Sequence, residues 1–151
     1  MENKAFQDIW PEWGTYCWGC GRNNEYGLQI KSYWDGDEIV CTWQPKKYHE
    51  AYMGALCGGI IATIIDCHCT NAAFAAVYKA EGRELGSEPI PHYATGSIYI
   101  KLLRPTTTRR PVTLRAQIKE KKTSKITVTC SLYSKNKLCA TGEVVVVNID
   151  R

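Results

Sequence analysis

Asp66 is the only charged residue in the apolar run of residues 55–66, and it follows Gly59 by seven positions. An ionised carboxylate among isoleucines loses much of its solvation free energy unless a partner compensates it, so packing alone rarely explains one. If Gly59 opens a helix, seven positions are close to two turns of ~3.6 residues, which places Asp66 on the same face as the unpaired N–H groups of the first turn. Such N–H groups can polarise a carbonyl oxygen, and a carboxylate can activate water or attack the carbonyl carbon. The pair predicts an active site for chemistry at a carbonyl group.

A structural role for Asp66 is the simplest alternative. The residue could point to solvent from a polar helix face, and the glycines could form only a tight turn. Residues 60–77 argue against this, because nearly all of them are apolar or small and leave no broad polar face. Apart from thiols, the ionisable groups in that stretch are Asp66 and His68. His68 projects to another side of the helix and is interpreted as a buried or interface histidine.

The eight cysteines suggest other chemistry, and free thiols are expected here rather than a disulfide framework. Cys17 and Cys20 form a CxxC motif, but the other close cluster, Cys67-His68-Cys69, projects its side chains to different sides of a helix. No metal site and no cofactor is therefore expected. A redox dithiol is disfavoured as well, because no thioredoxin-like strand and helix surround the motif.

Cys57 is a second possible nucleophile, with His68 or His49 as its base. It lies two residues before Gly59 in an apolar loop, and the sequence places no histidine beside it. Asp66 is therefore preferred as the reactive group.

The surrounding pattern predicts the elements that position these residues. A chain of 151 residues with 44% hydrophobic content predicts one domain over 1–151, in which residues 1–27 form an N-terminal helix and loop extension. A buried helix is expected over residues 59–79. Strands are expected over residues 28–33, 38–43, 94–103 and 139–147, and in alternating segments that begin at Val112 and Ile126. This order predicts an α+β fold in which an antiparallel sheet of about five to six strands wraps around one long helix.

The charge pattern limits the possible partners. The net charge is +4, and no dense basic run or recognition motif suggests nucleic-acid binding. The apolar run that ends at Asp66 is shorter than the ~18 residues expected of a membrane span, so a cytoplasmic protein is expected. Basic residues in the C-terminal half alternate with apolar ones, which is typical of solvated strands, although they could also line a groove for a phosphate-bearing molecule.

The chain resembles the hot-dog thioesterase superfamily, and specifically its phenylacetate-type (PaaI-like) branch. In that family a His-Gly-Gly motif precedes an acidic residue seven positions after the second glycine, and Gly58, Gly59 and Asp66 match this spacing. The resemblance covers most of the chain and includes residues 17–21, 27–28, 96–105 and 140–142.

The resemblance implies a hot-dog fold that hydrolyses an acyl-CoA or related thioester at the interface of a homodimer, or of a dimer of dimers (a homotetramer). It gives the Gly59 N–H the task of polarising the thioester carbonyl, while Asp66 from the partner subunit acts as general base or nucleophile. Thr70 matches a hydroxyl that holds substrate or water in some relatives, and Thr95 matches a second such hydroxyl.

The chain departs from the family at Cys57, which stands where a histidine usually supports the loop and the substrate. This departure would suit a non-catalytic acyl-CoA-binding protein, which is the alternative function. Tyr52 and His49 fall in a loop where relatives carry an amide that contacts substrate. The residues expected around the substrate are Gly58, Cys57, Tyr52, His49 and Thr95, and those expected to bind the CoA phosphates are Arg104, Arg109 and Arg110. Aromatic residues in the loops would suit an aryl or medium-chain acyl group, although they could instead fill the core of a dimer. They include Trp10, Trp13, Trp18, Tyr48 and Tyr52.

Overall fold

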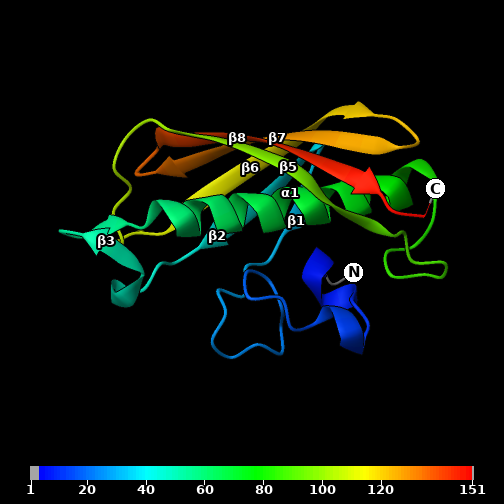
Figure 1. Cartoon of the computed structure of the whole chain (residues 1–151), viewed down its shortest axis with the longest axis horizontal. Coiled ribbons are helices and arrows are strands. Elements are labelled where there is room, and N and C mark those ends of the chain that lie inside the picture. Colours follow the sequence, from blue (N-terminus) through cyan, green and yellow to red (C-terminus); the bar gives the residue numbers. More distant parts are fainter. Residues whose placement is uncertain (1–3, 151) are drawn as a thin grey trace.

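The computed structural model describes residues 4–150 and contains one long helix packed against a six-stranded antiparallel sheet (Figure 1). The strands follow the order β1-β2-β6-β7-β8-β5. They are β1 (Tyr33–Asp35), β2 (Glu38–Trp43), β5 (Tyr93–Leu102), β6 (Val112–Lys121), β7 (Lys125–Ser134) and β8 (Lys137–Asn148). The helix is α1 (Gly58–Ala80). This is the α+β, hot-dog architecture that the sequence predicts.

The remaining elements are short. A two-stranded hairpin, β3 (Glu50–Tyr52) and β4 (Ala55–Leu56), leads into α1. The 3-10 helices are η1 (Phe6–Ile9), η2 (Glu12–Gly14) and η3 (Lys47–His49). The sequence had predicted only a loop where η3 and this hairpin lie.

The expected strand over residues 28–33 is wrong for most of its length, because β1 begins only at Tyr33. The Leu28 N–H donates to Trp18 O of the N-terminal loop over 2.8 Å, and Leu28 O accepts from the Trp43 side chain of β2 rather than from a strand backbone. Gln29 also adopts a φ of 52°, which interrupts an extended strand. The turn after β1 contains Gly36 at a φ of 64°, in the left-handed region that favours glycine.

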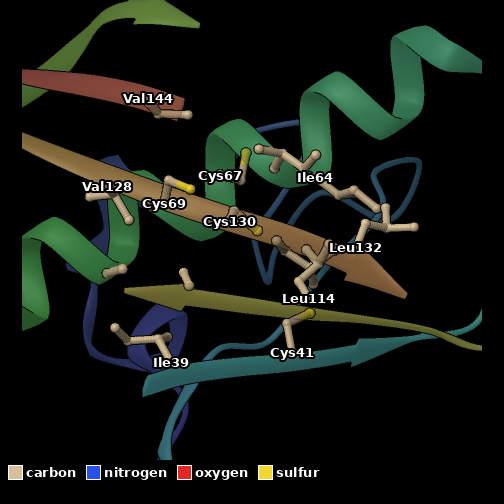
Figure 2. Close-up of a cluster of buried hydrophobic side chains, with 14 of the residues drawn as sticks. Ile39, Cys41, Ile64, Cys67, Cys69, Leu114, Val128, Cys130, Leu132 and Val144 are labelled. Atoms are coloured by element: carbon tan, nitrogen blue, oxygen red, sulfur yellow. The ribbon is translucent and has the colours of Figure 1, made fainter. Parts of the chain in front are cut away.

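The core lies between α1 and the inner face of the sheet. Figure 2 shows Ile64 and Cys69 of α1 close to Val128 and Leu132 of β7. All four residues are fully buried. A Cβ at Gly142 of β8 would lie only 2.6 Å from the Cγ2 of Ile65, so glycine is needed where the helix approaches β8. The helix and the sheet therefore have a fixed separation.

Helix α1 can be apolar on nearly every side, since other parts of the chain cover two of its faces. The sheet covers one face, and the N-terminal segment lies on the other (Figure 1). Trp10 of this segment donates from Nε1 to Asn71 Oδ1 over 2.9 Å, and its ring contacts Phe74 edge-on at 4.6 Å. By length and composition α1 could cross a membrane, but 72% of its most apolar window is buried inside the protein. That burial is typical of a core helix.

Candidate active site

The N-terminus of α1 presents unpaired backbone donors. The first helical hydrogen bonds run from the N–H groups of Ile60 and Ile61 to Cys57 O, over 3.0 and 3.1 Å. The N–H groups of Gly58 and Gly59 precede these bonds and have no acceptor within the helix. Together with the helix dipole, they form a site suited to an oxyanion.

The two glycines serve different purposes. A Cβ at Gly58 would lie 3.1 Å from Leu102 Cδ1, so this position is held close to the end of β5. At Gly59 the nearest atom to an added Cβ is Cys57 Sγ at 3.8 Å, and the residue is exposed. Gly59 therefore lies in an open position at the start of the helix.

Asp66 lies half-buried in α1 and accepts two hydrogen bonds. Thr95 Oγ1 of β5 donates to Asp66 Oδ1 over 2.7 Å, and Thr70 Oγ1 donates to the same oxygen over 3.2 Å. The two hydroxyl oxygens are 3.0 Å apart. The structure thus brings together three residues that the sequence had singled out, from two different elements.

A β-bulge positions Thr95. In the pairing of β5 with β8, Thr95 lies opposite Val146 and Ser97 lies opposite Val145, so Gly96 is the extra residue. Bulges redirect side chains and often lie beside functional sites. Here the bulge adjoins the hydroxyl that contacts Asp66.

A pocket of about 440 Å³ opens beside Asp66, a size typical of small-molecule sites. Its polar wall carries Asp66, Thr70 and Thr95. Aromatic and sulfur-bearing side chains complete the lining, namely Trp10, Trp13, Tyr16, Phe74, Tyr93, Cys17, Cys20 and Cys67. The N-terminal segment therefore supplies much of the pocket, which can accept an apolar group next to a carboxylate.

The Gly59 N–H and the Asp66 carboxylate of one chain cannot serve the same carbonyl group. Seven residues at ~1.5 Å each separate them by ~10 Å along the helix axis. A site that uses both groups would need the Gly59 N–H of one protomer and the Asp66 carboxylate of another. A site within one chain would need a different donor or a different base.

The three arginines lie away from the Asp66 pocket. Arg104, Arg109 and Arg110 are exposed in the loop between β5 and β6. This loop bonds to the segment before α1, since Leu56 N–H donates to Thr106 O over 2.6 Å and Thr108 N–H donates to Gly54 O over 2.9 Å. The arginines are thus held at the end of the molecule where α1 begins.

Tyr52 and His49 have contrasting surroundings. Tyr52 is 68% exposed on the hairpin before α1, whereas His49 is buried against the Trp43 ring, 5.2 Å between centroids. The His49 Nδ1 accepts a hydrogen bond from Lys46 N–H over 2.9 Å. Burial lowers the pKa of His49, which favours the neutral ring that this bond requires. Substrate contact stays a prediction for both residues.

In the part of the chain that the structure describes, neither the His49 ring nor the His68 ring is hydrogen-bonded to the Cys57 thiol, although the Cys57 N–H donates to His49 O over 3.0 Å. His68 is fully buried, with Nδ1 at 2.8 Å from Ser32 Oγ and Nε2 at 3.0 Å from Ile39 O. It is therefore the buried histidine expected from the sequence. The geometry gives no support to Cys57 as a histidine-activated nucleophile.

Three thiols, from Cys17, Cys20 and Cys67, meet at the pocket wall, a grouping that the sequence analysis missed. Their sulfur atoms all lie within 4.8 Å of one another, and those of Cys17 and Cys67 are 3.7 Å apart. Hydrogen bonds from Cys20 and Cys67 lower the pKa of the Cys17 thiol, while the pKa values of Cys20 and Cys67 are raised by their proximity to Cys17. The CxxC spacing was visible in the sequence, but its approach to Cys67 is a tertiary contact.

Known proteins share this fold. A thioesterase superfamily protein from Shewanella loihica PV-4, of known structure, is 34% identical to this chain, and the alignment covers 80% of this chain and 90% of that one with a TM-score of 0.66. The chain belongs to the thioesterase superfamily. This membership confirms the family that the sequence suggested and supports thioester hydrolysis as the general activity.

More distant superfamily members show the same fold. A thioesterase from Haemophilus influenzae is 21% identical, with 82% of each chain covered and a TM-score of 0.64. The PaaI protein from the phenylacetic acid degradation operon of E. coli is 15% identical, with 81% of this chain and 80% of that chain covered and a TM-score of 0.66. No protein-family model matches the sequence, and no curated protein matches it either.

Proposed function

We propose that the protein hydrolyses an acyl-CoA or a related thioester, with Asp66 as general base or nucleophile and the Gly59 N–H polarising the carbonyl. The observation that carries the proposal is the Asp66 carboxylate, held by two hydroxyl groups at the wall of a largely apolar pocket. Membership of the thioesterase superfamily supports the reaction class, and the pocket supports an acyl substrate.

The hydrogen bonds of Asp66 suit a general base. Both hydroxyl groups donate to Oδ1, so Oδ2 remains able to accept a proton from water. Water would attack the thioester carbon as its proton passes to Asp66, and the helix N–H groups would stabilise the oxyanion. Collapse of this intermediate breaks the C–S bond, and the leaving thiolate takes the proton that Asp66 had accepted, giving a carboxylic acid, a free thiol and the regenerated carboxylate.

The partly buried positions of α1 support a homodimer or a dimer of dimers. Between Ile61 and Tyr78 the helix is buried except at Ala62, Thr63, Asp66 and Thr70. With Gly59 these residues form one stripe at the spacing of three and four that marks a single helix face. If two copies of α1 pack antiparallel about a two-fold axis near Ala62 and Thr63, Gly59 of one copy lies opposite the partner's Asp66. This arrangement would bring the two groups to one carbonyl.

The edge strand β5 supports the same dimer. This edge strand carries Ile98, Tyr99 and Leu102, which are 43%, 63% and 59% exposed. A long edge strand with exposed apolar side chains needs a cover, because its free backbone groups otherwise recruit other strands. A second copy of β5 would continue the sheet and bury these side chains.

The arginine loop supports a nucleotide-bearing substrate. Arg104, Arg109 and Arg110 lie beside the start of α1, where the proposed oxyanion site is, and guanidinium groups bind phosphate in a bidentate manner. The acyl group would then extend toward the partner's pocket and the CoA phosphates toward these arginines. A cytoplasmic location, where CoA thioesters occur, is part of the same proposal.

A second candidate function is acyl-CoA binding without hydrolysis. The observation in its favour is Cys57, because a thiol at this position cannot replace the hydrogen bonds of the family's histidine. On this alternative Asp66 would contact the ligand and would activate no water.

The Asp66→Asn variant separates these functions. It keeps the size of the side chain and an oxygen for the two threonine bonds but cannot take a proton, so thiol release from a panel of acyl-CoA esters is expected to fall a hundredfold or more. Binding of acyl-CoA and the melting temperature should stay unchanged, or the melting temperature should rise, since an amide costs less to bury. Asp37→Asn, on an exposed turn, is the matched control. Full activity in Asp66→Asn would reject the proposal, and ligand binding without turnover in the unmodified protein would favour the binding function.

A further inference from the structure

The three thiols of Cys17, Cys20 and Cys67 form a site that thioester hydrolysis does not use. Two of them come from the N-terminal loop and the third from α1, 50 residues after Cys17. They are the one group of three or more His, Cys, Asp or Glu side chains with metal-ligand spacing in residues 4–150.

Glycines allow the loop to bring its thiols onto the helix. A Cβ at Gly19 would lie 2.4 Å from Cys67 Sγ, and one at Gly21 would lie 2.4 Å from Thr15 O. A side chain at Gly19 would push the loop away from α1, and one at Gly21 would disrupt the turn of the loop itself. A bond of 2.7 Å from Gly21 N–H to Cys17 O closes the turn between the two cysteines. The loop is thus built for close approach of sulfur to sulfur.

The spacing of the sulfur atoms fits a tetrahedral ion. Zinc binds thiolate at ~2.3 Å, so two sulfur ligands of a tetrahedral zinc are ~3.8 Å apart. Cys17 Sγ and Cys67 Sγ are 3.7 Å apart, and Cys20 Sγ is within 4.8 Å of both. A small movement of Cys20 would complete three corners of the tetrahedron.

Asn71 acts as a neighbour that supports such ligands. Its Nδ2 lies 3.7 Å from Cys20 Sγ and donates to Cys67 O over 2.8 Å. Its Oδ1 is held by Trp10 Nε1, which fixes the direction of the amide. Hydrogen bonds from such neighbours orient metal ligands and reduce the charge on the sulfur.

We propose that Cys17, Cys20 and Cys67 bind one Zn²⁺ ion per chain, with water as the fourth ligand facing the pocket beside Asp66. Three thiolates favour zinc over the hard cations Mg²⁺ and Ca²⁺, which prefer oxygen. All three cysteines line that pocket, so the fourth corner is accessible to small molecules. The ion would tie the N-terminal loop to α1 and hold the aromatic wall of the pocket in place.

Metal analysis of the purified protein tests this directly. Elemental analysis is expected to find about one zinc per chain, and none after dialysis against a chelator at low pH. Addition of Co²⁺ to the metal-free protein should give the visible absorption bands of a tetrahedral site and the near-ultraviolet bands of cobalt bound to thiolate. Both readouts are independent of thioesterase activity, so they decide on the metal whether or not the protein hydrolyses thioesters.

Single variants identify the ligands. Cys17→Ser is the main variant, because its side chain is exposed and its replacement should leave packing intact. It should lower the zinc content well below one per chain and abolish the cobalt bands, and Cys67→Ser should do the same. Cys139→Ser is the control, since Cys139 donates to Lys137 O over 3.5 Å and a serine hydroxyl can replace that bond.

Three outcomes would overturn the proposal. The first is protein that lacks zinc and fails to bind added Zn²⁺ or Co²⁺. The second is zinc content unchanged in Cys17→Ser. The third is a disulfide between Cys17 and either neighbour, found by mass spectrometry of protein purified without reductant, which would make the cluster a redox site. If Cys67→Ser fails to fold, Cys17→Ser alone decides.

Discussion

Thr95 donates a hydrogen bond of 2.7 Å to Asp66 and so connects edge strand β5 to helix α1 at the wall of the pocket. The bond depends on the bulge at Gly96, which lies next to Thr95 in the strand that the proposed dimer would cover. In the proposed dimer, the strand that holds the Asp66 carboxylate would also be the strand at the interface between the two copies.

The first prediction concerns Thr95. Thr95→Val keeps the β-branched shape but removes the hydroxyl, so kcat is expected to fall about tenfold, the value of one hydrogen bond to a charged group. Thr95→Ser should restore most of the activity. Ser97→Val, across the bulge on the same strand, is the control and should leave kcat unchanged. Equal rates for Thr95→Val and the unmodified enzyme would show that Asp66 needs no support from β5.

The arginine loop gives a second prediction. Replacing Arg109 and Arg110 together by Ala should raise KM for acyl-CoA about tenfold and change kcat less, because exposed phosphate contacts aid binding more than chemistry. The double variant Lys119→Ala, Lys122→Ala removes the same two charges from β6 and the turn after it, where both lysines pair with glutamates. Its KM should stay near that of the unmodified protein. An unchanged KM in the arginine variant would remove these residues from the substrate site.

The sequence was sufficient for the elements whose pattern is local. The helix is recognisable because residues 60–77 are apolar on all sides, and β2 and β6 to β8 because their buried residues alternate. The region before β1 could not be predicted in this way, since Leu28 bonds to the backbone of Trp18 in the N-terminal loop and to the side chain of Trp43, and neither bond belongs to a strand ladder. Local propensity contains no information about such a partner.

The residues of the candidate site also fall into two groups, those found from the sequence and those that only the structure revealed. Asp66 and the two glycines were found from their spacing, and Thr70 and Thr95 from the family resemblance. The meeting of Cys17 with Cys67 was missed, because it depends on how the N-terminal loop folds over α1. The glycines at positions 19 and 21 were visible in the sequence, yet their purpose follows only from the atoms they approach in space.

A third prediction uses His68, which is buried and neutral. Burial lowers its pKa to about 4 from the ordinary 6.5. The pKa of His68 is lower in the folded chain than in the unfolded chain, so protonation favours unfolding. The contribution of His68 to the free energy of unfolding is therefore complete above pH 6.5 and is lost as the pH falls toward 4. The difference corresponds to about 3 kcal/mol of unfolding free energy.

Urea unfolding between pH 7.5 and pH 4, with chelator in every sample, measures this contribution. His68→Gln should show a weaker loss of stability on acidification than the unmodified protein, although its stability at neutral pH will be lower. Identical pH profiles for His68→Gln and the unmodified protein would show that His68 is not the titrating group.

The last prediction tests whether each site contains residues of two protomers. Gly59→Pro removes the proposed oxyanion donor, and proline is tolerated in the first turn of a helix because the N–H group there has no helical acceptor. This variant and Asp66→Asn should each be inactive alone. Co-expressed in equal amounts, they should form mixed dimers in which one site combines an intact Gly59 with an intact Asp66, so activity should return to about a quarter of the original. Light scattering should give a mass at least twice the 17.0 kDa of one chain for every sample. If the donor and the carboxylate acted within one chain, no mixture could contain a complete site, and co-expression would restore nothing.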